Sequence, residues 1–312
     1  MQKLSLQDIF AKSQNIPHFL NKIKKNNYNK LMEQAECLKI LEEITLPCYD
    51  NGKKFTNTQK LDKIDSFLSS TNWTRTELPL CRLYSKKPIE EMRPPLIVIS
   101  SHADIVPQIK KPFIDLKLED LRIKNVDIPK EDIMIGTLDN AITNAALLTL
   151  MMEKNLLPDN AIAAFTGNEE SGCLGAMDLA MKLKGMKKKF RAIVLDVTWE
   201  GWENKCGFTI ENDFWGNRWG KAIVKTAEKT GFMWDYVPVD PSDIPSFVPH
   251  DRISENTSMP DEAWSYDDMD IETFSLCLPV LGSMHSEKGA AASKSSFMQY
   301  RQALSAIANI EI

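Results

Sequence analysis

Residues able to bind metal ions recur at one kind of position in this sequence. The 312-residue chain holds only four histidines, and two of them follow apolar segments with the length and composition of strands. Several acidic residues do the same. The full set at or just after the C-terminal ends of such segments is His102, Asp139, Glu169, Glu170, Asp196 and His285. Ligands collect at that edge of an open parallel α/β sheet, so these side chains are expected to converge in one crevice.

Two imidazoles and four carboxylates in one crevice favour metal chemistry. Carboxylates repel one another, and burial raises the cost further unless cations neutralise them. Imidazole with carboxylate is a ligand set that suits zinc and tolerates manganese or cobalt. A carboxylate can also bridge two ions about 3.5–4 Å apart, so the six groups are enough for two metals.

Alternating helix and strand patterns surround these residues and must position them. Apolar spacing predicts helices over residues 28–45, 61–70, 141–154, 176–184 and 293–307, and strands over 161–166, 191–197 and 274–281. Such alternation is typical of βαβ units, and so predicts a three-layer α/β/α sandwich around a mostly parallel mixed sheet. Residues 204–270, rich in Trp, Asp and Pro, are expected to be irregular.

A single domain over residues 1–312 is expected, because no repeat, low-complexity linker or clear boundary divides the chain. Residues 1–60 form its predicted helical N-terminal part. In the helix over 28–45, an apolar stripe is expected to pack against the rest of the domain, and it consists of Leu31, Ala35, Leu38, Leu41 and Ile44.

The composition excludes several classes of protein. Lys and Arg number 38 against 43 Asp and Glu, a net charge of −5, which argues against nucleic-acid or anionic-membrane partners. No apolar stretch approaches the length of a membrane span or a signal peptide. The six cysteines are dispersed without a CxxC pair, which indicates reduced thiols and a cytoplasmic location.

The order of the six residues and the sequence around them resemble those of the co-catalytic di-zinc exopeptidase superfamily. The resemblance covers residues 94–292, and its sharpest segments are HADIVP, GTLDNAITNAALL, FTGNEESGCLGA, IVLDVT and MHSEKG. That superfamily includes leucyl, glutamyl and tetrahedral aminopeptidases, and carboxypeptidases and deacylases related to aminoacylase. It implies a zinc-exopeptidase-like fold, of the phosphorylase/hydrolase-like type, and a hydrolase.

The resemblance implies a complete set of ligands for two Zn²⁺ ions, with Co²⁺ or Mn²⁺ as substitutes. In that arrangement His102 and Asp196 hold one ion, Glu170 and His285 hold the other, and Asp139 bridges both. By the same resemblance, the Asp139–Asn140 peptide bond is expected to be cis.

Two further carboxylates receive roles from the resemblance. Asp104 orients His102, in the usual carboxylate–histidine–zinc arrangement. Glu169 takes a proton from the metal-bridging water and passes it to the leaving amine, as general base and then general acid. An oxyanion donor is also needed, and the candidates in the segment between the last two ligands are His250 and Tyr266.

The chain departs from the superfamily at two positions. Thr143 stands where a glycine often follows the bridging aspartate by four residues, and Gly289 stands where a glutamate often follows the last histidine by four. The 37 positions from His102 to Asp139 and the 89 from Asp196 to His285 are too few for the inserted lid or dimerisation domains of some relatives.

The chain is therefore expected to be a bare catalytic domain and, first, an aminopeptidase acting on peptides. An N-acyl amino acid deacylase or a carboxypeptidase on the same site is the main alternative, and a non-catalytic binding homologue is a third. The oligomeric state and the substrate side chain stay open at the level of sequence.

Overall fold

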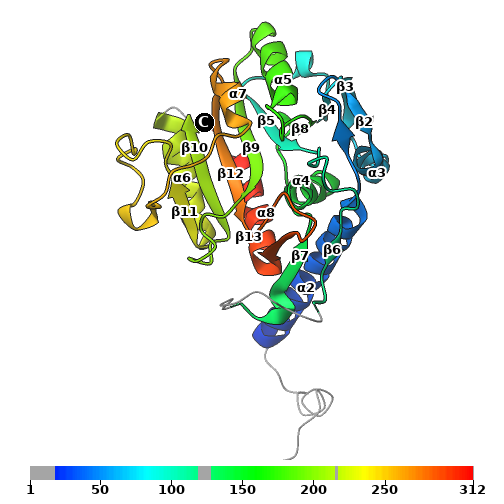
Figure 1. Ribbon diagram of the computed structural model, residues 1–312. Coiled ribbons are helices and arrows are strands. Elements are labelled where there is room, and N and C mark those ends of the chain that lie inside the picture. The colour runs from blue at the N-terminus through cyan, green and yellow to red at the C-terminus, as the bar shows by residue number, and fades with distance from the viewer. Residues whose placement is uncertain (1–17, 119–127, 215–216, 312) are drawn as a thin grey trace, which may run out of the picture.

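The computed structural model describes residues 18–118, 128–214 and 217–311 (Figure 1). Residues 1–17 of the predicted N-terminal part lie outside this range. None of the helices in the described part of the chain has both the length and the apolarity needed to cross a bilayer.

An eight-stranded mixed sheet forms the middle of the molecule, with strand order β11-β10-β12-β9-β5-β8-β4-β3. Its four central strands run parallel, and they are β12 (Glu272–Pro279), β9 (Phe190–Thr198), β5 (Leu96–His102) and β8 (Ala161–Thr166). The outer strands are β11 (Trp234–Val237), β10 (Phe208–Phe214), β4 (Cys81–Ser85) and β3 (Thr74–Leu78). Strands β5 and β8 are buried along their whole length, as the near-continuous apolar runs of parallel strands require.

Helices cover both faces of this sheet (Figure 1). One face packs against α2 (His18–Ile44), α3 (Gln59–Leu68), α4 (Ala141–Met152), α6 (Asn217–Thr230) and α8 (Lys294–Ala308). The other packs against α5 (Leu174–Gly185) and the short α7 (Ala263–Asp267). The three-layer α/β/α sandwich with a mixed sheet is therefore confirmed.

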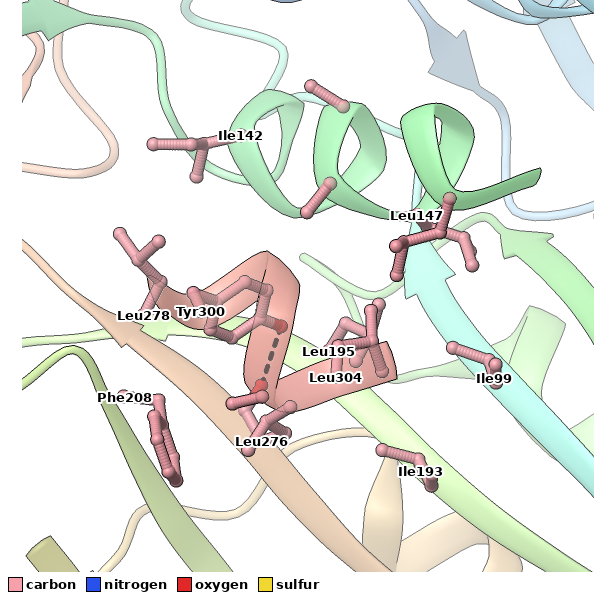
Figure 2. Close-up of a cluster of buried hydrophobic side chains, with 14 of the residues drawn as sticks. Ile99, Ile142, Leu147, Ile193, Leu195, Phe208, Leu276, Leu278, Tyr300 and Leu304 are labelled. Atoms are coloured by element: carbon pink, nitrogen blue, oxygen red, sulfur yellow. Dashed lines mark hydrogen bonds between the residues drawn. The ribbon is translucent and has the colours of Figure 1, made fainter. Parts of the chain in front are cut away.

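The larger core lies between the sheet and helices α4 and α8. Figure 2 shows Ile142 and Leu147 of α4 and Tyr300 and Leu304 of α8 beside leucines and isoleucines of β5, β9 and β12. The Tyr300 hydroxyl donates to the Leu276 carbonyl oxygen at 2.8 Å, so the one polar atom of this ring is satisfied inside the core. This core fixes the strands whose ends carry the candidate metal ligands.

Smaller sheets and turns complete the domain. One joins β13 (Leu281–Gly282), β14 (Ala290–Ser293), β7 (Ile133–Gly136) and β6 (Ile114–Asp115), and the other joins β1 (Tyr49–Asp50) and β2 (Phe55–Asn57). The 3₁₀ turns are η1 (Ile89–Glu91), η2 (Lys130–Asp132) and η3 (His250–Arg252).

Glycine at position 289 has a structural reason. Gly289 adopts φ +72°, and a Cβ atom there would lie 2.5 Å from the Gly136 carbonyl oxygen in β7. A glutamate, which related sequences often place here, would collide with that strand and strain the backbone. The departure from the superfamily therefore belongs to the close pairing of β14 with β7.

The prediction that residues 204–270 are irregular is wrong. This stretch contains β10, α6, β11 and α7. Its strands escaped prediction because polar residues such as Glu211 occupy buried positions in β10, which breaks the apolar pattern of a strand. Helix α6 has an amphipathic pattern, with Trp219, Ile223 and Ala227 on its buried face. The helix was missed because the sequence around it is rich in Trp and Pro.

The predicted apolar stripe on α2 is correct only at its C-terminal half. Leu41 and Ile44 are fully buried, whereas Leu31 is 64% exposed and Ala35 is also exposed. Leu31 is exposed because the N-terminal half of α2 extends past the body of the domain (Figure 1). The buried face of the helix instead includes Cys37 and Ile40.

We expect Leu41→Ala to lower the free energy of unfolding by about 2–5 kcal/mol, because it opens a cavity in a close-packed core. The matched change Leu31→Ala on the same helix should alter it by no more than about 0.5 kcal/mol. Urea unfolding followed by circular dichroism measures both. Equal losses in the two variants would show that the whole predicted stripe is buried.

Candidate metal centre

Three neighbouring parallel strands deliver most of the candidate ligands to one edge of the sheet. His102 is the last residue of β5, Asp196 lies near the end of β9, and Glu169 and Glu170 follow β8 in the turn that leads into α5. In the register of β5 with β9, Ser101 pairs with Leu195, so His102 and Asp196 lie side by side. The convergence expected from the sequence is present.

Two candidate ligands reach the same edge from the smaller sheet. Asp139 lies between β7 and α4, and His285 lies in the connection between β13 and β14. The antiparallel pairing of β14 with β7 therefore brings together residues about 150 positions apart in sequence.

Asp139 stands between the two histidines, and each of its carboxylate oxygens faces a different one. Oδ1 lies 2.9 Å from Nε2 of His102, and Oδ2 lies 3.0 Å from Nε2 of His285. His102 Nε2 is also 3.7 Å from Oδ1 of Asp196, and His285 Nε2 is 3.3 Å from Oε2 of Glu170. The residues thus form two groups that share Asp139.

The spacing of these donor atoms fits zinc. Bonds of about 2.0–2.1 Å in a tetrahedral site set neighbouring donors roughly 3.3 Å apart, and the separations of 2.9, 3.7, 3.0 and 3.3 Å within the two groups lie near that value. Donor atoms of His102, Asp139 and Glu170 all lie within 4.8 Å of one another. Imidazole and carboxylate donors of this kind suit Zn²⁺ by their chemistry as well.

Asp104 lies behind His102 on the side away from Asp139. Its Oδ1 is 3.4 Å from His102 Nδ1, and both side chains are almost fully buried. A carboxylate at Nδ1 leaves Nε2 directed at the shared centre, and the orienting role of Asp104 stays a prediction.

The electrostatics of the cluster disfavour its own negative charge. Burial, together with the charges of Asp196 and Asp139, raises the pKa of Glu169 to about 9. Burial and the charge of Asp139 raise the pKa of Glu170 to about 7. Burial also acts on Asp139, but hydrogen bonds with His102 and His285 hold its pKa below the usual range. Carboxylates crowded in this way gain stability from a bound cation.

A buried polar network fixes the start of α4 beneath the site. Asn144 Nδ2 donates to the His102 carbonyl oxygen at 2.8 Å and to Ser101 Oγ at 2.6 Å. The Thr143 hydroxyl donates to Asn140 and lies 2.9 Å from Ser101 Oγ, and Asn140 Nδ2 donates to the Leu195 carbonyl oxygen. Thr143, the second departure from the superfamily, is therefore a member of this network.

The Asp139–Asn140 peptide bond is cis, as expected.

The sequence analysis missed two supports from the N-terminal part of the chain. Lys60 of α3 is fully buried, and its Nζ donates to the carbonyl oxygen of Ala103, between His102 and Asp104, at 3.0 Å. Asp50 accepts a hydrogen bond from the backbone N–H of Asn168, directly before Glu169, at 2.7 Å. Neither residue has a sequence signal, since a lysine in a polar helix and an aspartate before a glycine turn are both common at surfaces.

The two oxyanion candidates do not reach the site. Tyr266 belongs to α7 and is fully buried; its hydroxyl donates to Ser100 Oγ at 3.0 Å, and Ser100 Oγ donates to Glu262 at 2.8 Å. His250 is exposed at the start of η3. Neither lines the cavity beside the metal ligands.

That cavity, with a volume of about 260 Å³, opens directly onto the cluster. Asp139, Glu169, Asp196 and His285 form one wall. The remaining walls come from the end of β9, from β10 and β12, and from the loop before α7. A substrate in this cavity would contact Glu169 and the metal ligands together.

Comparison with known families identifies the sequence around the site. Residues 85–234 match the model of peptidase family M28, a span that contains all the candidate ligands except His285. None of the curated proteins is similar enough in sequence to count as a match. The predicted resemblance to zinc exopeptidases is confirmed by the family match and by the fold.

Several solved structures share this fold across nearly the whole chain. The aminopeptidase APDkam598 from the archaeon Desulfurococcus kamchatkensis is 11% identical, with a TM-score of 0.61 over 88% of this chain and 94% of that one. The TET aminopeptidase from the marine sediment archaeon Thaumarchaeota archaeon SCGC AB-539-E09 is 10% identical, with a TM-score of 0.59 over 89% and 98%. The TET1 peptidase of Pyrococcus horikoshii is 14% identical, with a TM-score of 0.57 over 88% and 99%.

We expect Thr143→Val to lower the free energy of unfolding by about 1–3 kcal/mol, because it removes the Thr143 hydroxyl that donates to the buried Oδ1 of Asn140, at nearly unchanged side-chain volume. The exposed Thr56→Val should change it by no more than about 0.5 kcal/mol. Guanidinium unfolding monitored by tryptophan fluorescence tests the pair. A neutral Thr143→Val would show that the network does not hold α4 in place.

Proposed function

We propose that this chain, which carries a peptidase family M28 domain over residues 85–234, is a zinc-dependent aminopeptidase that removes N-terminal residues from peptides. The observation that carries the proposal is the geometry of Asp139, whose two oxygens each face a different histidine at 2.9 and 3.0 Å. The fold shared with aminopeptidases, and the cavity that opens onto Glu169, support it.

Two zinc ions are proposed, with Co²⁺ or Mn²⁺ as substitutes. His102 and Asp196 would hold one, Glu170 and His285 the other, and Asp139 would be shared. Support comes from the two groups of donors, each with one imidazole nitrogen and one carboxylate beside an oxygen of Asp139. A shared carboxylate with nitrogen and oxygen donors on both sides is the arrangement of two-metal hydrolases.

Glu169 is the proposed general base and then general acid. Bound zinc lowers the pKa of an attacking water and polarises the peptide carbonyl. The Glu169 carboxylate lines the cavity beside the candidate ligands, where it can take a proton from the water and return it to the leaving amine. Asp104 keeps His102 oriented, and the network around Asn144 keeps the end of β5 in position.

The alternatives use the same residues. A deacylase or carboxypeptidase would cut blocked or C-terminal amides with the same base, and the intact ligand set argues against a purely binding homologue. The six cysteines are unpaired, and five of them are buried, which supports a reducing, cytoplasmic location.

A library of peptides with free or acylated N-termini, incubated with zinc-loaded protein and read by mass spectrometry, tests the activity. We expect stepwise loss of residues from free N-termini. Glu169→Gln should slow this loss by about 10²–10⁴-fold, because proton transfer is lost, while zinc content stays unchanged. The exposed Glu203→Gln serves as the matched control and should behave as the wild type.

Cleavage restricted to acylated peptides would replace the aminopeptidase with a deacylase, and cleavage at C-termini would replace it with a carboxypeptidase. Zinc-loaded protein that leaves every peptide intact would refute the hydrolase.

Removing the shared ligand tests the metal proposal separately. Wild-type protein dialysed against zinc should hold about two ions per chain by inductively coupled plasma mass spectrometry. We expect Asp139→Ala to lose most of this zinc, whereas the exposed Asp159→Ala should retain it. Full zinc retention in Asp139→Ala would contradict the shared site.

A further inference from the structure

The cavity beside the candidate metal centre is amphipathic. Close to its mouth it is lined by Trp199, Met259 and Met284, of which Trp199 is 57% and Met259 72% exposed. It is also lined by three carboxylates that take no part in the proposed metal ligation, and these are Glu200, Glu211 and Asp261. Its volume of about 260 Å³ is close to the lower limit for small-molecule pockets, room for a single side chain.

The acidic wall follows from the pleat of the sheet. Along β10 and β12, Phe208, Ile210, Phe274 and Leu276 point into the core under α8. The alternate positions therefore point to the opposite face, and there β10 carries Thr209 and Glu211. Glu211 thus lies on the same face of the sheet as the ligand Asp196, two strands away.

No cation in the described part of the chain stabilises the ionised form of the buried Glu211 side chain. Glu211 is only 5% exposed, and its Oε1 accepts a hydrogen bond from Thr209 Oγ1 at 2.6 Å. Among the described residues, neither Glu211 nor Asp261 forms an ion pair with a Lys, Arg or His. Burial, with the charges of Asp261 and Glu200, raises the pKa of Glu211 to about 8. A cation placed in the cavity would remove that cost.

The three carboxylates share the cavity with metal-ligand candidates, and their charges act on one another. The charge of Asp196 acts on Asp261, and the charges of Asp261 and Glu200 act on Glu211. Asp261 also caps α7, since its Oδ1 accepts the backbone N–H of Ala263 at 2.8 Å. Glu211 lies on β10, two strands away from the ligand Asp196 on β9, so a side chain must extend along the cavity to reach it.

We propose that this cavity selects a basic first residue, lysine or arginine, with the cation of the substrate side chain paired to Glu211. The inference rests on the proposed aminopeptidase function and names its substrate class. The hydrocarbon stem of such a side chain would lie along Met259, Met284 and Trp199 while its charged end reaches the carboxylate. An apolar side chain would leave the buried Glu211 without a cation, so the cavity disfavours it.

Binding of amino acid amides tests the proposal without any need for catalysis. L-lysinamide and L-norleucinamide share the α-amino group and the four-carbon stem, and differ by the ε-ammonium group. Isothermal titration calorimetry of the zinc-loaded protein should show lysinamide binding tighter by about tenfold or more, the value of a charged hydrogen bond.

Glu211→Gln keeps the shape of the side chain and its acceptor for Thr209. We expect it to reduce the lysinamide preference to about twofold or less while leaving norleucinamide binding unchanged. The exposed Glu255→Gln, in the loop before the cavity wall, is the matched control and should keep the full preference. The ratio of kcat/KM for lysyl and norleucyl p-nitroanilides should follow the binding ratio.

Equal binding of the two amides to the wild type would overturn the proposal, even if peptides are cleaved. Weaker binding of both amides in Glu211→Gln would also overturn it, because Glu211 would then hold the α-amino group. A Glu211-dependent lysinamide preference in protein that cleaves nothing would support the basic pocket and refute the aminopeptidase. The wild-type comparison needs no variant to fold.

Discussion

The concentration of buried carboxylates at one edge of the sheet is the constraint on which the rest of the structure depends. Asp104, Asp139, Glu170 and Asp196 lie together with little exposure to water. Such an arrangement is unfavourable unless positive charge lies among the carboxylates. The chain places two imidazoles and the buried Lys60 there, and the donor spacing admits zinc. The proposed metals are thus part of what makes this edge of the fold stable.

The residues beneath the carboxylates are polar because hydrogen bonds must fix the positions of the strand ends that carry them. Hydrogen bonds from Asn140 and Asn144 tie α4 to the ends of β9 and β5, so the start of the helix cannot shift without breaking them. On the opposite face, Glu262 accepts hydrogen bonds from Ser100 and Thr166 and joins β5 to β8. Hydroxyls and amides at strand ends replace the apolar residues of the strand centres, because they must satisfy backbone and ligand atoms near a charged site.

The sequence was sufficient where local pattern and chemistry agree. Strand β8 was predicted with its observed limits, since an apolar run between a turn and a helix has one good solution in a parallel sheet. The candidate metal ligands could be proposed because their types and strand-end positions are unusual together. Lys60 and Asp50 were not found, because their roles depend on contacts with residues 43 and 118 positions away. Strand β10 was missed because it buries Glu211, which no pattern rule places inside a sheet.

Glu211, the buried residue that prevented the prediction of strand β10, is also the residue proposed to select the substrate. A strand tolerates a buried, uncompensated carboxylate only where its loss of hydration is offset, and here the cavity gives water or a cation access to it. The same face of the sheet that presents Asp196 to a metal therefore continues as an acidic surface toward Glu211. A peptide bound across it would have its scissile bond beside Glu169 and its first side chain directed at Glu211. The electrostatic constraint that fixes the metal centre thus extends into the cavity, and it makes the charge of the first residue, rather than its volume, the property that the site distinguishes.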